Sequence, residues 1–209
     1  MTPVPRPRFH TLARERQEAV LHAALDEFST HGFAAASLNR IIAVAGVSKG
    51  SMYYYFDDKE DLYRYLLRVQ VEQLIADAGP FTVPTATGPA GYWSQLEDHC
   101  LRLVRALDAS PRLAGLLRDW MSGTGAPAME QEQRDAEHTM LPWLTRALAA
   151  GQQIGAIRTD IPDPLLLAVI IAIGRVIDSC VIAETPGPLD HAAAVHTIVG
   201  ILRRAVQPW

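Results

Sequence analysis

Apolar residues recur three and four positions apart along most of this chain, and no convincing run alternates with a period of two. The first spacing places apolar side chains on one face of an α-helix, whereas a half-buried strand needs the second. Prolines favour the first turn of a helix because their φ angle is fixed. Four of them stand at or just before expected helix starts: Pro111, Pro127, Pro162 and Pro188. The spacing therefore predicts an all-α fold.

The breaks in this spacing divide the chain into a small N-terminal bundle and a larger C-terminal bundle. Residues 2–10, with three prolines and two arginines, are expected to form a flexible arm. Thr11 can cap the first helix, which should end at His31 and Gly32. Residues 79–91 hold three prolines and three glycines, a loop composition. The helices expected after that loop are Tyr92–Ala109, Arg112–Met121, Ala128–Ala150, Asp163–Ala183 and Leu189–Val206.

Composition and charge narrow the class of protein. The 209 residues are 49% hydrophobic and 20% charged with a net charge of −4, which excludes a uniformly basic nucleic-acid coat. Residues 1–70 nevertheless carry nine basic and eight acidic side chains, so only this part can meet a polyanion without net repulsion. Two cysteines exclude a disulfide scaffold. No signal peptide is visible, and the longest apolar run, residues 165–174, falls short of a membrane span, so we expect a cytoplasmic protein without membrane contact.

Residues 37–62 predict a helix-turn-helix. Ser37 can cap a helix that ends at Gly46, where the missing side chain permits a sharp turn. Ser48 can cap a short second helix over residues 49–56. Met52 and Phe56 lie four apart and should pack against the first helix, together with Val47.

The opposite face of the short helix has an unusual composition. Lys49 and Tyr53 are four apart and share this face, with Gly50 and Tyr54 beside them and the hydroxyl of Ser51 nearby. A cation, hydroxyls and a glycine that lets the backbone approach closely suit phosphates and base edges in a DNA major groove. The alternative is a packing motif whose tyrosines form a half-buried cluster, but it explains neither Lys49-Gly50 nor Lys59.

The same segment resembles the DNA-binding region of the TetR family of transcriptional regulators. The matching residues are Ser37, Ala45-Gly46-Val47-Ser48, Lys49-Gly50, Tyr53-Tyr54-Tyr55-Phe56, Lys59-Glu60 and Leu62. Ile42 departs from the pattern, since many members carry Ala there. The resemblance implies a DNA-binding domain over residues 1–58, with the arm at 1–10, and an effector-binding and dimerisation domain over residues 59–209.

Carried over to this sequence, the resemblance implies two kinds of DNA contact. The DNA backbone would be anchored by Ser37, Tyr53, Tyr55 and Lys59, with Ser48 and its neighbouring amides as further phosphate donors. Base or near-base contacts would come from Arg40, Lys49, Gly50, Ser51 and Tyr54. Arg6 and Arg8 could in addition reach a minor groove as part of the arm.

The C-terminal bundle resembles the family in its architecture, which implies a pocket for a small, largely apolar effector and a homodimer formed by the last two helices. Each apolar candidate by itself is better explained as plain core, and Arg175 and Asp178 could simply pair with each other or cross the dimer interface. Gly174 and Gly200 lie inside helices, where glycine costs roughly 1 kcal/mol, and close helix approach would justify this cost. The pocket candidates are Trp93, Leu96, Cys100, Trp120, Met121, Met140, Trp143, Leu144, Ile171, Arg175 and Asp178. The interface candidates are Gly174, Ile177, Val181, His196, Val199, Gly200 and Arg203.

The sequence as a whole favours a ligand-released dimeric repressor on a pseudo-palindromic operator, and two other readings stay open. One is a DNA-binding regulator controlled by a protein partner instead of a small molecule. The other is an all-α enzyme. The sequence lacks the common nucleotide-binding and hydrolase motifs, which speaks against an enzyme. His99 and Cys100 are adjacent, and His191 and His196 are five residues apart. Neither spacing places two side chains on one helix face, so neither pair suits a metal ion, and no metal or cofactor is expected.

Overall fold

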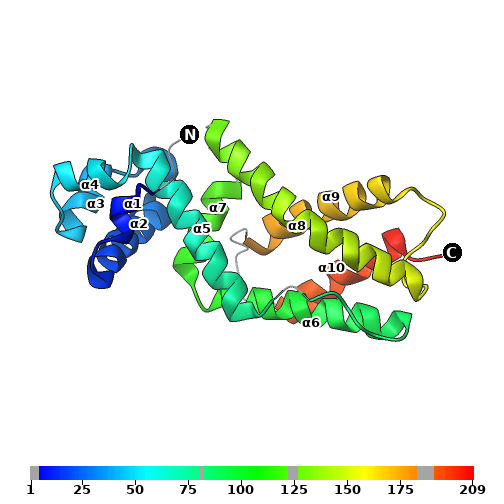
Figure 1. The fold of residues 1–209 in the computed structure, drawn as a ribbon. Helices are drawn as coiled ribbons and strands as arrows, with labels where there is room; N and C mark the ends of the chain where they lie inside the picture. The colour runs from blue at the N-terminus through cyan, green and yellow to red at the C-terminus, as the bar shows by residue number, and fades with distance from the viewer. Residues whose placement is uncertain (1–4, 81, 122–126, 183–190) are drawn as a thin grey trace. The chain divides into compact units, whose positions relative to one another are not determined.

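A computed structural model describes residues 5–80, 82–121, 127–182 and 191–209, and it describes side chains in these ranges except at 127–137, 175–182 and 191. The regular structure in these ranges is α-helical throughout, as predicted (Figure 1). The helices are α1 (Pro7–His10), α2 (Arg14–Ala35), α3 (Leu38–Ala45), α4 (Lys49–Tyr55), α5 (Lys59–Ala78), α6 (Pro89–Asp108), α7 (Pro111–Met121), α8 (Pro127–Gln153), α9 (Asp163–Ile182) and α10 (His191–Val206).

The chain forms two compact units, and each is built from two separate stretches of the sequence. One unit comprises residues 1–73 and 110–133, and the other comprises residues 74–109 and 134–209. The predicted DNA-binding segment lies within the first unit, which also takes in most of α5 and all of α7. The predicted boundary after residue 58 concerns function and stays a prediction.

Side-chain caps and one left-handed glycine set the ends of α3 and α4, as the sequence predicts. The Ser37 hydroxyl accepts from the amide of Arg40, and the Ser48 hydroxyl accepts from the amide of Ser51 at 3.0 Å. Gly46 ends α3 with φ 64° and ψ 29°, a conformation that costs glycine little. These three residues therefore fix where the second helix of the motif begins.

The start of the chain differs from its prediction. Residues 7–10 form the short helix α1, and the Phe9 side chain is fully buried, so the expectation of a flexible arm over residues 2–10 is wrong for this part. Residues 1–4 lie outside the described ranges. The predicted cap at Thr11 is also wrong, because α2 is preceded by Ala13 and the Thr11 hydroxyl instead donates to the carbonyl of Arg8.

Helix α7 packs along α2 inside the first unit, where two glycines allow close approach. A Cβ placed on Gly115 would lie 3.1 Å from the carbonyl oxygen of Ser29. Asp119 accepts hydrogen bonds from the amide of Phe33 at 2.9 Å and from the hydroxyl of Tyr63 at 2.7 Å. Burial, reinforced by this hydrogen bond to Asp119, raises the pKa of Tyr63 well above its usual value. The helical path of α2 breaks at Gly32, next to this carboxylate.

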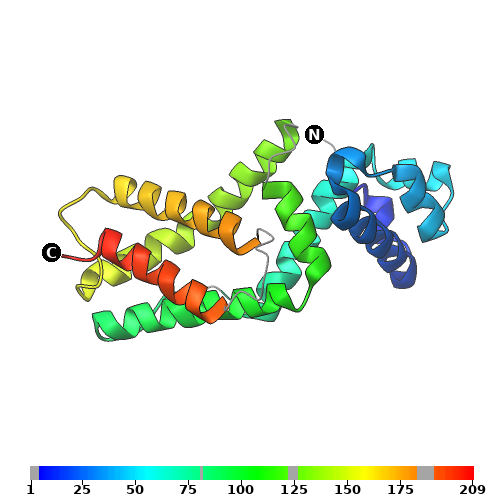
Figure 2. The same ribbon diagram turned by 180° about the vertical axis from the view of Figure 1, so that it is seen from behind.

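The second unit has a core of its own built from α6, α8, α9 and α10 (Figure 2). Tyr92 and Trp93 from α6 pack with Leu148, Ile157 and Val199 among others. The Tyr92 hydroxyl donates to the carbonyl of Ala147, and burial raises the pKa of Tyr92 to about 12.

Gly32 and Gly46 both have positive φ, yet substitution by alanine should affect them differently. Gly32 lies at φ 67° and ψ 168°, a region that is essentially restricted to glycine, and an added Cβ would lie 2.6 Å from Asp119 Oδ1. Gly46 lies in the left-handed helical region with nothing within 4 Å of an added Cβ. We expect Gly32→Ala to lower the free energy of unfolding by roughly 3 kcal/mol and Gly46→Ala by about 1 kcal/mol. Urea unfolding of both variants checks this, and equal losses would contradict it.

Candidate nucleic-acid interface

The helix-turn-helix has one buried face and one exposed face. Ile41 of α3 and Met52 of α4 are fully buried, and Phe56 directly after α4 is almost so. On the other side of α4, Tyr53 and Tyr54 are 44% and 43% exposed, and Lys49 and Gly50 are exposed as well. The predicted division of α4 into an inner and an outer face is therefore confirmed.

The outer face of α4 is open to an approaching surface at its first turn. A Cβ added to Gly50 would meet only the Ser48 hydroxyl, at 3.9 Å, so a partner can come close to the backbone here. The hydroxyls of Ser48 and Ser51 lie 2.8 Å apart at the helix start. The face thus presents an ammonium, two phenols, hydroxyls and exposed backbone, the donor and acceptor types that read phosphates and base edges.

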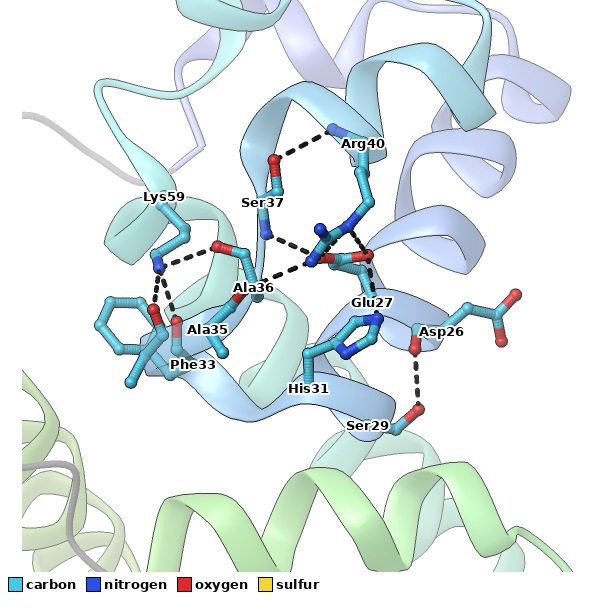
Figure 3. A network of polar contacts seen from close by, with 11 residues as sticks. Asp26, Glu27, Ser29, His31, Phe33, Ala35, Ala36, Ser37, Arg40 and Lys59 are labelled. Carbon is cyan, nitrogen blue, oxygen red and sulfur yellow. Dashed lines mark hydrogen bonds and ion pairs between the residues drawn. The ribbon is translucent and has the colours of Figure 1, made fainter.

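Arg40, predicted to contact bases, is held within the protein by Glu27 of α2 (Figure 3). Its Nε donates to both carboxylate oxygens at 2.9 and 3.0 Å. Glu27 Oε1 also accepts from the amide of Ser37, so one buried carboxylate holds the start of α3. The hydrogen bond from Arg40 holds the pKa of Glu27 below its usual value. Arg40 therefore has a structural role, and any DNA contact that it makes would compete with this ion pair.

Lys59, predicted to anchor a phosphate, instead holds the segment between α2 and α3 (Figure 3). Its ammonium donates to the carbonyls of Phe33, Ala34 and Ala36 at 2.6, 3.2 and 3.0 Å. The ammonium also lies 4.6 Å from the centre of the Phe33 ring. An ammonium has three N–H donors, and these carbonyls use all of them. This geometry leaves Lys59 no donor for a phosphate.

The remaining predicted contacts divide by exposure. Tyr55 is half-buried, and its ring centre lies 5.9 Å from that of Phe9, so its side chain packs against α1 and is not part of the exposed face of α4. Ser37 is half-buried and occupied as the cap of α3. The structure therefore brings Ser48, Lys49, Gly50, Tyr53 and Tyr54 together on one exposed surface, with the half-buried Ser51 beside Ser48, and we call these six residues the α4 surface.

The predicted pocket residues do not lie in one unit. Trp120 and Met121 belong to α7 of the first unit, whereas Trp93, Leu96, Cys100, Met140, Trp143, Leu144 and Ile171 belong to the second. Trp93 is part of the second core, and Leu96 and Cys100 pack against it. The side chains of Arg175 and Asp178 lie outside the described residues. Whether these residues line a pocket stays a prediction.

The predicted interface residues are also of two kinds. Val199 is only 4% exposed and packs in the core of its own unit, so it is not available at the surface. His196, Arg203 and the half-buried Gly174 and Gly200 lie nearer the surface, and His196 pairs with Glu97 at 2.9 Å. The side chains of Ile177 and Val181 are outside the described residues.

Comparison with known proteins identifies the motif. The sequence profile described as "Bacterial regulatory proteins, tetR family" matches residues 20–66, which run from α2 into α5 and include the whole helix-turn-helix. The HTH-type transcriptional regulator RutR of Escherichia coli K12 is 49% identical over 53 residues, a quarter of each chain. Residues 20–66 therefore form a tetR-family domain. The match to RutR spans only about a quarter of that relative's length, so it concerns the DNA-binding segment alone.

Longer matches to other regulators cover the C-terminal bundle as well. The HTH-type transcriptional repressor SCO4008 of Streptomyces coelicolor is 29% identical over 159 residues, which is 75% of this chain and 74% of that one. The fold is similar to that of a TetR family regulator from Chloroflexus aurantiacus, with a TM-score of 0.67 at 22% identity over 99% and 100% of the two chains. It is also similar to the fatty acid degradation regulator FadR from Bacillus halodurans, with a TM-score of 0.69 at 19% identity over 89% and 97%.

Sequence reasoning missed the role of Glu27, although a signal for it exists. Glu27 lies four residues after Ala23 and three after Ala24, on the face of α2 that these buried alanines share. A carboxylate on a buried face needs a cationic or amide partner, and Arg40 and Ser37 supply it.

The described residues hold neither a metal-binding cluster nor a membrane-spanning helix. No cluster of three His, Cys, Asp or Glu side chains suited to a metal ion was found among them. Within the same ranges, no helix has the length and apolar character needed to cross a membrane.

Loss of the lysine charge should lower stability at Lys59 and leave it almost unchanged at Lys49. Lys59→Met leaves three backbone carbonyls without their donor, and we expect the free energy of unfolding to fall by about 2–3 kcal/mol. Lys49→Met removes an exposed charge, and stability should change by less than about 0.5 kcal/mol. Thermal and urea unfolding of the two variants measure this difference. A stable Lys59→Met variant would show that the carbonyl contacts matter little.

The Glu27 carboxylate predicts a dependence of stability on pH. A folded-state pKa below the ordinary value of 4.5 means that the carboxylate stabilises the fold above that pH. This contribution is lost as the pH falls through the lower folded value. We expect the difference in unfolding free energy between wild type and Glu27→Gln to be constant near neutral pH and to shrink below pH 4.5. A difference that does not change between neutral and acidic pH would exclude the carboxylate as its source.

Proposed function

We propose that the protein is a DNA-binding transcriptional regulator that acts as a repressor in the bacterial cytoplasm. The observation that carries this proposal is the α4 surface. Lys49, Tyr53 and Tyr54 project from a helix that Ser48 caps, while the scaffold beneath is fixed by side chains such as Glu27 and Lys59. Tyrosines side by side with a lysine and a glycine on one exposed face offer donors and acceptors at close backbone approach, and DNA phosphates and base edges supply matching groups.

We infer that the protein binds a pseudo-palindromic operator as a homodimer formed by α9 and α10. Leu165 and Val169, one turn apart on α9, are 56% and 36% exposed, and Ile201 on α10 is 47% exposed. A Cβ added at Gly174 would meet nothing within 4 Å, so a partner helix could approach there closely. Two copies of α4 about 34–36 Å apart would then face successive major grooves on one side of the DNA.

A small, largely apolar effector in the C-terminal bundle would release the DNA. Helix α5 belongs to both units, with its first part in one and its end in the other, so movement of α5 could connect a ligand to the α4 surface. For the ligand to act, it must bind the DNA-incompetent state more tightly, by roughly 1–3 kcal/mol in typical cases. This part of the proposal rests on resemblance to the family. Relatives that regulate transcription also speak for a regulator over an enzyme.

The test is selection of genomic DNA fragments by the purified protein at fixed moderate salt, followed by affinity measurement on the enriched site. We expect a pseudo-palindrome and a log–log salt slope on the order of −7, as for about eight neutralised phosphates. Lys49→Ala and Tyr53→Ala should each abolish binding without unfolding the protein.

Arg14→Ala is the matched control for Lys49→Ala, because it removes one positive charge at a site 88% exposed on α2, where Arg14 pairs with Glu18. It should leave operator affinity within about twofold. No enriched sequence from folded protein, or full binding by both α4 variants, would contradict the proposed function.

A further inference from the structure

The segment from Arg6 to Phe9 lies against the C-terminal end of α4. The backbone amide of Arg6 donates to the carbonyl of Tyr55 at 3.0 Å. Its Nη1 donates to the carbonyl of Tyr53 at 3.2 Å, and its Nη2 forms an ion pair with Asp57. One residue near the start of the chain thus makes three contacts at the end of a helix almost 50 positions later.

These contacts supply what a short helix lacks. The last four carbonyls of any α-helix have no partner within the helix, and a seven-residue helix is marginal by itself. The Met52 carbonyl accepts from the amide of Phe56 at 3.0 Å, whereas those of Tyr53 and Tyr55 accept from Arg6. A guanidinium at a helix C-terminus also complements the negative end of the helix dipole. Arg6 therefore acts as a C-terminal cap that comes from a distant part of the chain.

The neighbouring residues explain why Arg6 lies there. Pro7 disfavours helical backbone in the residue before it, and Arg6 is extended, with φ −59° and ψ 146°. Phe9, after one turn of α1, is fully buried, and its ring lies 5.0 Å from that of Phe56 and 5.5 Å from that of Tyr65. The buried ring fixes α1, and the extended residue before α1 then runs past the end of α4.

Arg8 connects the same segment to the outer face of α4. Its guanidinium lies 3.9 Å from the centre of the Tyr54 ring, which is 43% exposed, and Arg8 itself is exposed. A cation stacked on the face of a tyrosine ring restricts the positions that the ring can take. Arg6 thus holds the backbone of α4, and Arg8 holds one of its surface side chains.

We propose that residues 6–9 form a strap that sets the recognition helix α4 for DNA binding, and that Arg6 is a positioning residue in it. The inference rests on the proposed function, since it assumes that the α4 surface reads DNA. In this arrangement the Arg6 guanidinium is directed to Asp57 and to the Tyr53 carbonyl, so its proposed role is to hold α4 and not to contact DNA. Without Arg6 the end of α4 frays, and Tyr53 and Tyr54 lose their fixed positions.

The test compares Arg6→Ala with Arg14→Ala, which removes the same charge from an arginine whose ion pair, with Glu18, lies within α2. Operator affinity should fall about tenfold for Arg6→Ala, the scale of a lost charged hydrogen bond, and stay near wild type for Arg14→Ala. The salt slope of Arg6→Ala should equal that of wild type, whereas loss of a phosphate contact would lower it by about 1. Arg6→Lys keeps the charge and should recover part of the affinity.

Amide hydrogen exchange provides a readout that does not depend on DNA. Arg6→Ala should speed exchange in residues 52–57 and leave the rest of α2 and α3 protected, and Arg14→Ala should not. Wild-type affinity and unchanged exchange in Arg6→Ala, with binding lost in Lys49→Ala, would overturn the strap and leave the proposed function intact. If wild type binds no DNA, the proposed function fails, and with it the part of this inference that concerns DNA.

Discussion

The geometry of the helix-turn-helix depends on a short corner of backbone, residues 32–37, that is held by side chains from three helices. Lys59 of α5 donates hydrogen bonds to three carbonyls of this corner. Asp119 of α7 accepts from the amide of Phe33, and Glu27 of α2 accepts from the amide of Ser37. Loops that carry so many polar backbone groups are usually satisfied by water. Here protein charges replace much of that water, so the angle between α2 and α3 is fixed by charged hydrogen bonds.

This arrangement also explains why α7 belongs to the first compact unit although α6, its neighbour in sequence, belongs to the second. Gly115 lets α7 lie close to α2 at Ser29, Arg112 pairs with Asp26 at 3.0 Å, and Asp119 reaches the break at Gly32. Close backbone approach, an ion pair and a half-buried carboxylate lie along one helix face. The unit that holds the α4 surface is therefore assembled from two separate stretches of the sequence.

Several helix bounds were predicted to within a few residues, because prolines and caps are local signals, but the first long helix begins at Arg14 and ends at Ala35 instead of at His31. The expected helix at residues 112–121 is observed as α7 at Pro111–Met121, and the cap at Ser48 and the turn at Gly46 are as predicted. Partners far apart in the sequence were not predictable from spacing. Lys59 and its carbonyls are separated by more than 20 positions, and resemblance to the family assigned this lysine to DNA instead. Helix α1 was missed because its prolines indicate a loop, while its one buried ring, Phe9, gives no periodic signal.

The seven-residue length of α4 has a consequence for how this protein can change. Its ends are fastened by the Ser48 hydroxyl on one side and by Arg6 on the other, and its inner face contributes Met52 to the core. Side chains on the outer face contribute little to keeping the helix in place. Substitutions on that face can therefore change the DNA sequence that the protein is proposed to bind. The supporting framework stays unchanged.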